Sequence, residues 1–82
     1  MVKLQLTDKQ YETLKAIADF TKKFSMPPSF AELRVILGIS SNQSLLDRLN
    51  LLSEKGLVTR DAKRHRSILL SSKGTVYLEQ KQ

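Results

Sequence analysis

The sequence contains no cysteine and no tryptophan, and it holds a single histidine, His65. Without cysteine the chain can form neither a disulfide nor a zinc site with thiolate ligands. A metal site that needs several histidine ligands cannot be formed with a single histidine. A catalytic triad would also have to be assembled around His65 alone. We therefore expect no enzyme activity, no metal and no other cofactor.

Long apolar runs are also missing, since the longest uninterrupted run has three residues, as in Ile68-Leu69-Leu70. A membrane-spanning helix needs about 20 apolar residues. The first residues, Met1 to Leu6, lack the apolar stretch of a signal peptide. These absences predict no membrane partner and a cytoplasmic location.

The sequence is rich in basic charge. Its 82 residues include 14 Lys and Arg against 8 Asp and Glu, for a net charge of +6. A hydrophobic content of 40% is enough for a small globular core. The length predicts one domain, and a domain this basic commonly binds a polyanion such as nucleic acid.

Capping signals predict the first helices. Thr7 and Gln10, like Ser29 and Glu32, have the spacing of a capping box, which predicts helices starting at Thr7 and Ser29. The lysines of the first helix are expected on a solvated face, paired with Asp19. Its apolar face is predicted to hold Tyr11, Leu14, Ile17, Ala18, Thr21 and Phe24.

The next helices are separated by glycine. Gly38 is predicted to end the second helix, and Gly56 is predicted to stop a third that runs from about residue 41 to residue 55. The buried stripe of this third helix is predicted to be Leu45, Leu49 and Leu52.

After Gly56 the pattern becomes that of strands. Residues 57–60 and 67–70 predict two short strands with a basic tip at 61–66. Ser71 or Ser72 can cap a last helix through Leu78, although Gly74 in its first turn weakens that prediction. The predicted fold class is mainly α with a small β-hairpin. We assign residues 1–70 to the domain and residues 71–82 to a tail or short helix.

A short helix, a turn containing Gly38 and a longer helix form the pattern of a helix-turn-helix, whose second helix enters the DNA major groove. Gln43 near the start of that helix suits a bidentate contact with adenine. Leu46 can meet a thymine methyl group, and Asp47 can accept from cytosine N4. The polar residues predicted to contact bases are Ser41, Asn42, Gln43 and Ser44.

The basic tip of the hairpin suits contact with phosphates or a narrow minor groove. An ordinary solvated hairpin tip is the alternative. His65, between two arginines, is either a polar tip residue or a partner of phosphate. The tip residues predicted to contact DNA are Lys63, Arg64, His65 and Arg66.

Over about residues 4 to 70 the sequence resembles the N-terminal DNA-binding domain of the LexA repressor family. The resemblance implies a winged helix-turn-helix of three helices and a two-stranded wing. It also implies sequence-specific binding of double-stranded DNA and transcriptional repression. The matching residues are Leu6-Thr7, Gln10, Leu14, Met26-Pro27-Pro28-Ser29, Glu32, Leu37-Gly38, Ser41, Leu49, Leu52, Lys55-Gly56, Arg66 and Ile68.

The resemblance also implies roles for single positions. Ser29 and residues 64–66 are implied to touch the DNA backbone. Departures from the family pattern at Phe24-Ser25, Arg34, Leu46 and Arg48 leave the operator sequence open. The implied base-reading positions are Ser41, Gln43, Ser44, Leu46 and Asp47.

Assembly and origin stay open at this stage. We expect no counterpart of the family's self-cleaving protease domain, and a bacterial, phage or mobile-element source. The tail, with Val76 and Tyr77, either pairs two copies or packs on the first helix while a homodimer forms on DNA. A frayed end is the third option. The alternative function is a protein–protein interaction module that uses Leu46 and Leu51.

Overall fold

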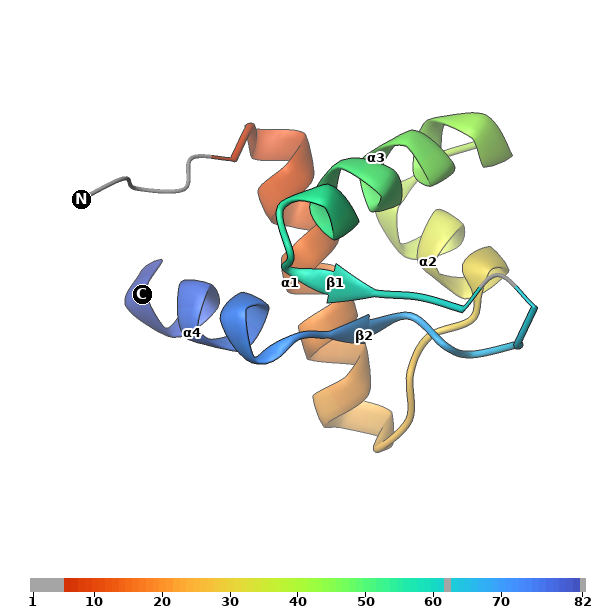
Figure 1. The fold of residues 1–82 in the computed structure, drawn as a ribbon. Coiled ribbons are helices and arrows are strands. Elements are labelled where there is room, and N and C mark those ends of the chain that lie inside the picture. The colour runs from red at the N-terminus through yellow and green to blue at the C-terminus, as the bar shows by residue number, and fades with distance from the viewer. Residues whose placement is uncertain (1–5, 62, 82) are drawn as a thin grey trace.

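A computed structural model of the chain describes residues 6–61 and 63–81. Its elements are α1 (Asp8–Phe24), α2 (Phe30–Leu37), α3 (Asn42–Glu54), β1 (Val58–Thr59), β2 (Leu69–Leu70) and α4 (Ser72–Lys81). The two strands pair antiparallel. In Figure 1, α1 runs through the middle of the molecule, with α2 and α3 on one side, α4 on the other and the hairpin across it. This arrangement is the predicted winged helix-turn-helix.

The first two helices begin as the sequence predicts. The Thr7 hydroxyl accepts from the backbone N–H of Gln10, and the Gln10 side chain accepts from that of Thr7, both at 3.2 Å. Ser29 and Glu32 form the same reciprocal pair at 2.9 and 3.0 Å. Each box satisfies two backbone donors that a helix start leaves without a partner. The helices therefore start one residue after Thr7 and Ser29.

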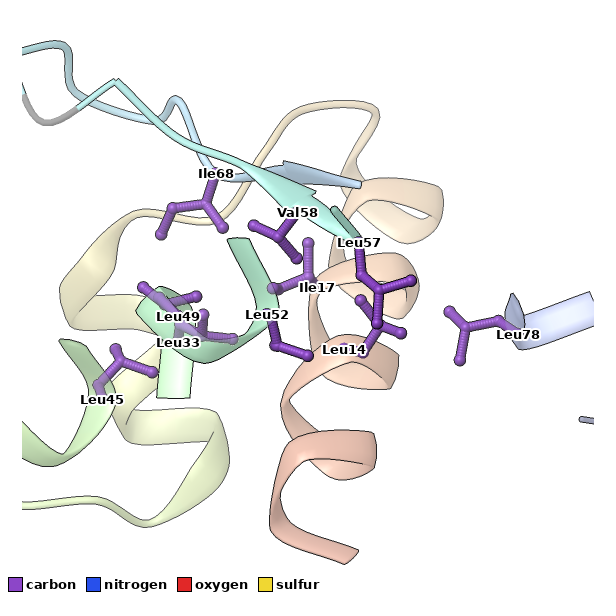
Figure 2. Packing of buried hydrophobic residues seen from close by; sticks show 10 residues of the cluster. All are labelled: Leu14, Ile17, Leu33, Leu45, Leu49, Leu52, Leu57, Val58, Ile68 and Leu78. Carbon is purple, nitrogen blue, oxygen red and sulfur yellow. The ribbon is translucent and has the colours of Figure 1, made fainter. Parts of the chain in front are cut away.

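One hydrophobic cluster joins all the helices and the hairpin. Leu14 and Ile17 of α1 meet the α3 stripe of Leu45, Leu49 and Leu52, and all five are fully buried. This confirms the predicted stripe of α3. Figure 2 shows these side chains converging with residues from α2, the hairpin and α4, namely Leu33, Leu57, Val58, Ile68 and Leu78.

The predicted apolar face of α1 is wrong in its last turns. Phe24 is 49% exposed, whereas Phe20 is buried. Asp19 pairs with Lys15 at 3.8 Å rather than serving the predicted Lys22 and Lys23. The reason is that α1 extends past the elements that cover it, as Figure 1 shows. Within the described residues no helix, including this 17-residue one, has both the length and the apolar composition needed to cross a membrane.

The hairpin is shorter than predicted, with two residues in each strand instead of four. Side-chain hydrogen bonds replace the strand ladder beyond Thr59. The Ser67 hydroxyl accepts from the Asp61 N–H at 3.0 Å and donates to the Asp61 carbonyl at 2.7 Å. The residues that flank the tip are therefore joined without regular strand pairing.

The predicted last helix forms, runs to Lys81 instead of ending at Leu78, and packs on the rest of the molecule. The Ser71 hydroxyl caps it by accepting from the Gly74 N–H at 3.0 Å. A side chain at position 74 would collide with the Leu57 carbonyl, so glycine permits the close approach of α4 to the hairpin. Leu78 is 8% exposed and belongs to the core. Of the expectations for the tail, the structure supports packing against α1 and β2.

Candidate nucleic-acid interface

The first turn of α3 presents a group of exposed polar side chains. Ser41 caps the helix, because its hydroxyl accepts from the Ser44 N–H at 3.3 Å. Asn42, Gln43 and Ser44 follow it and are all exposed. Burial of the leucine stripe fixes the rotation of the helix, so Gln43, on the opposite side, faces solvent. The polar side chains of this turn are therefore accessible to a binding partner.

One turn further along, two predicted base-reading residues contact each other. The Gln43 amide Nε2 donates to Asp47 Oδ1 at 2.8 Å, and both side chains are exposed. The bond orients the carboxamide of Gln43 relative to the helix. It leaves the carbonyl Oε1 and the second N–H of Gln43 for another partner. Leu46, between them in sequence, is half-buried.

The turn between α2 and α3 is fixed by Arg34. Its guanidinium Nη1 donates to the Ser40 carbonyl at 3.0 Å, which ties α2 to the residue preceding the α3 cap. Gly38 supplies the left-handed conformation at the end of α2, with φ of 68°. Arg34 stood out in the sequence only as a departure from the family pattern, and its role in the turn was not predicted.

A second arginine joins α3 to the first helix. Arg48 Nη1 donates to the Thr13 hydroxyl at 3.3 Å, and Thr13 is fully buried. The two residues lie 35 positions apart, so no local pattern could have paired them. Together with the turn contact of Arg34, this bond sets where the start of α3 lies on the surface.

In the described part of the hairpin tip, Asp61 and residues 63–66, two hydrogen bonds hold a basic turn. The Asp61 carboxylate accepts from the Lys63 N–H, and the Asp61 carbonyl accepts from the Arg64 N–H, each at 3.0 Å. Lys63, Arg64 and His65 are exposed. Between this tip and Phe30 at the start of α2 lies a hollow of about 320 Å³. Lys63 and Arg64 therefore lie beside the first turn of α2.

Arg66 differs from the other tip residues because its guanidinium is engaged within the protein. Nη1 and Nη2 donate to the two carboxylate oxygens of Glu32 at 2.8 and 3.0 Å, and Nη1 also donates to the Pro27 carbonyl. The hydrogen bond from Arg66, with a second from the Ser29 N–H, lowers the pKa of Glu32 to about 2. Arg66 thus fastens the hairpin to the start of α2 in this structure.

The predicted contact residues therefore fall into two groups. Those of α3 and the hairpin tip lie toward the same side of the molecule, remote from α4, as Figure 1 shows for these elements. Ser29 and Arg66 instead belong to the contacts between α2 and the hairpin. Ser29 is 6% exposed and its hydroxyl accepts from the Glu32 N–H. Glu32 was predicted as a capping residue, and its ion pair with Arg66 was missed.

Comparison with known proteins agrees with this geometry. The family model of the LexA DNA binding domain matches residues 3–67. The LexA repressor of Bartonella quintana is 35% identical over 63 residues, which cover 77% of this chain and 27% of that protein. The LexA repressor of Streptomyces coelicolor is 36% identical over 62 residues, covering 76% of this chain and 26% of the repressor.

A third relative extends the match further. The LexA repressor of Anaeromyxobacter dehalogenans is 34% identical over 67 residues, which cover 82% of this chain and 29% of that protein. The chain thus spans less than a third of the length of these curated relatives. The matched family residues cover α1, α2, α3 and β1 and end before β2 and α4.

Proposed function

The chain belongs to the LexA DNA-binding domain family, and on that basis we propose that it binds specific sequences of double-stranded DNA and represses transcription. The proposed activity is binding alone, with no catalytic step and no cofactor. The net charge of +6 supports a polyanionic partner. DNA as partner implies a cytoplasmic place of action in a bacterial host.

The observation that carries this proposal is the exposed polar first turn of α3, fixed in position by a buried leucine stripe and by Arg34. In a helix-turn-helix this turn enters the major groove. Gln43 would contact adenine through Oε1 and its second N–H, with the first N–H held by Asp47. Ser41, Asn42 and Ser44 would contact neighbouring bases or phosphates.

The hairpin tip would contact the DNA backbone or the minor groove through Lys63, Arg64 and His65. The hydrogen bond between Asp61 and Lys63 and the exposure of Lys63 and Arg64 support this role. We assign Arg66 to a different task from the one that the sequence suggested. Through Glu32 it would hold the tip at a fixed distance from α2, and Ser29 would support the same contact.

Selection of bound sites from random duplexes, followed by a salt titration on the selected site, tests the proposal. Contact with phosphates predicts that log K falls with log salt by about 0.9 for each phosphate contacted. Recovery of an inverted repeat would support binding by two copies. No selected sequence, together with a flat salt dependence, would contradict DNA binding and favour the protein–protein interaction module instead.

A further inference from the structure

A groove of about 880 Å³ runs between α1 and α2, and its lining residues all come from these two helices. Its apolar part includes Ala16 and Phe20 together with three well-exposed side chains. Val35 is 79% exposed, Ile36 51% and Phe24 49%. A contiguous apolar surface bordered by charged residues is typical of an interaction site, whereas single exposed hydrophobic residues are common on any protein surface.

The groove is separate from the proposed DNA interface. Among the residues that the structure describes, none from α3 or the hairpin tip lines the groove. Glu32 links the two regions, because it borders the groove and also binds Arg66. A partner seated between α1 and α2 would therefore leave the first turn of α3 and the basic tip accessible.

The charges along α1 indicate what this partner is. Glu12, Lys15, Asp19 and Lys23 border the groove, so negative and positive side chains alternate along the helix. If two copies of α1 pack antiparallel, Glu12 of one lies near Lys23 of the other, and Lys15 lies near Asp19. A two-fold axis makes each of these attractive contacts occur twice. A parallel arrangement in register would instead oppose like charges.

Other features of the segment suit the same arrangement. Ala16 lies close to its middle, where a small side chain lets two helices approach closely. Lys15 and Asp19 already form an exposed ion pair within one helix at 3.8 Å, and a second copy would extend this pair into a four-charge network. Such networks contribute more than isolated exposed pairs.

We propose that the groove between α1 and α2 is a self-association surface, which binds a second copy of this chain with the two α1 helices antiparallel. Val35 and Ile36 of each copy would cover the apolar side chains of the other. This inference goes beyond DNA binding and does not depend on it, because dimerisation through α1 and α2 needs no nucleic acid.

Sedimentation equilibrium without DNA tests the inference. The mass of the wild-type chain should rise with concentration from one copy toward two. Val35→Glu should raise the dissociation constant at least about tenfold, a change of about 1.4 kcal/mol. Val76→Glu is the matched control, because Val76 is a 48% exposed valine on α4, outside the groove. It should dimerise as the wild type does.

Reversing the charge at Glu12 or Lys23 tests the antiparallel arrangement more directly than Val35→Glu does. Glu12→Lys and Lys23→Glu should each weaken self-association, since each places like charges opposite one another. An equal mixture of the two variants should dimerise again, because every Lys then faces a Glu. A wild-type chain that stays monomeric to about 1 mM would overturn the proposal. So would equal effects of Val35→Glu and Val76→Glu, or a mixture that fails to associate.

Measuring the DNA affinity of Val35→Glu distinguishes a failure of the proposed self-association from a failure of the proposed DNA binding. Val35→Glu should bind a single half-site with wild-type affinity, since Val35 lies outside the proposed DNA interface. Intact half-site binding with wild-type self-association would contradict the dimer surface alone. Loss of half-site binding in this variant, with its fold intact by circular dichroism, would contradict the separation of the two surfaces.

Discussion

At the scale of single residues, the contact between Gln43 and Asp47 determines which polar atoms α3 presents at the proposed DNA interface. A free glutamine rotates about its side-chain torsions, and fixing it on binding opposes affinity through lost entropy. The bond to Asp47 at 2.8 Å orients the amide in advance. In the proposed complex the carboxylate of Asp47 would also repel phosphates, so the pair would lower the affinity for DNA in general while it orients Gln43.

Gln43→Ala should weaken binding to the selected site by about 1–3 kcal/mol and relax the base preference at one position. Asp47→Ala should relax the same position, while its affinity for unrelated duplexes rises because a negative charge is removed. Fluorescence anisotropy on the selected site and on an unrelated duplex measures both effects. If Gln43→Ala weakens both duplexes equally, Gln43 does not contact a base.

A second residue-scale prediction concerns Glu32, whose pKa falls from 4.5 to about 2 in the folded chain. Because the unfolded chain takes up the proton first, the contribution of the Glu32–Arg66 pair is present above about pH 4.5. It should be lost as the pH falls toward 2. Urea unfolding of the wild type and of Glu32→Gln should differ at neutral pH and converge in acid. A pH-independent difference would show that the ion pair is not its cause.

At the scale of elements, local patterns could predict the helices because their signals lie within a few residues. The capping pairs Thr7–Gln10 and Ser29–Glu32 are three positions apart, and the leucines of α3 follow the helical period. The hairpin could be predicted only in outline. Its strand length depends on hydrogen bonds between Asp61 and Ser67, which compete with the ladder.

Contacts between elements are the part that sequence alone could not supply. The basic tip could be recognised because its charges are adjacent in the sequence. The ion pair between Arg66 and Glu32 could not be predicted, because the two residues are 34 positions apart. The density of basic residues in the sequence predicts the same role for Arg64 and Arg66. Their contacts in the folded structure differ, because Arg64 is exposed and Arg66 binds Glu32. The exposure of Phe24 has the same origin, because helical periodicity does not say how far the neighbouring elements extend along α1.

The two tip arginines should therefore behave differently when replaced. Arg64→Ala should weaken all duplexes and reduce the salt slope by about 1, the loss of one phosphate contact. Arg66→Ala should lower the urea midpoint of unfolding, whereas Arg64→Ala should leave that midpoint unchanged. Lys63→Ala serves as a second exposed control for stability. Equal salt slopes and equal midpoints for Arg64→Ala and Arg66→Ala would contradict this division of roles.

Gly74 provides a test of how α4 meets the hairpin. In an ordinary helix, glycine to alanine stabilises by up to about 1 kcal/mol. Here Gly74→Ala should destabilise the protein, because the added Cβ would collide with the Leu57 carbonyl. Lys73→Ala, at the neighbouring exposed position, controls for helix propensity. A higher melting temperature for Gly74→Ala would contradict the close approach of α4.

At the scale of the whole molecule, the surface of the described residues contains two regions with different proposed functions. The start of α3 and the hairpin tip form the proposed DNA interface, while α1 and α2 border the proposed self-association groove. The core between them is small, and α4 completes it through Leu78. In a domain of this size each element contributes a large share of the buried surface. The tail, which forms α4, is therefore expected to contribute to the stability of the fold.

Truncation after Leu70 should therefore abolish or strongly weaken folding, rather than only remove a pairing element. The deletion takes away Leu78 and uncovers the Leu57 side of the core, as Figure 2 shows. Leu78→Ala alone should destabilise by about 2–5 kcal/mol, a large fraction of the 5–15 kcal/mol typical of folded domains. Urea unfolding followed by circular dichroism measures both changes.

Val76→Ala, on the same helix but 48% exposed, should shift stability by no more than about 0.5 kcal/mol. The truncated chain should accordingly lose half-site DNA binding together with its fold, because the leucine stripe that positions α3 belongs to the core that Leu78 completes. A chain of residues 1–70 that unfolds at the wild-type urea concentration would show that α4 is dispensable. The first 70 residues would then form the domain by themselves, as their sequence pattern suggested.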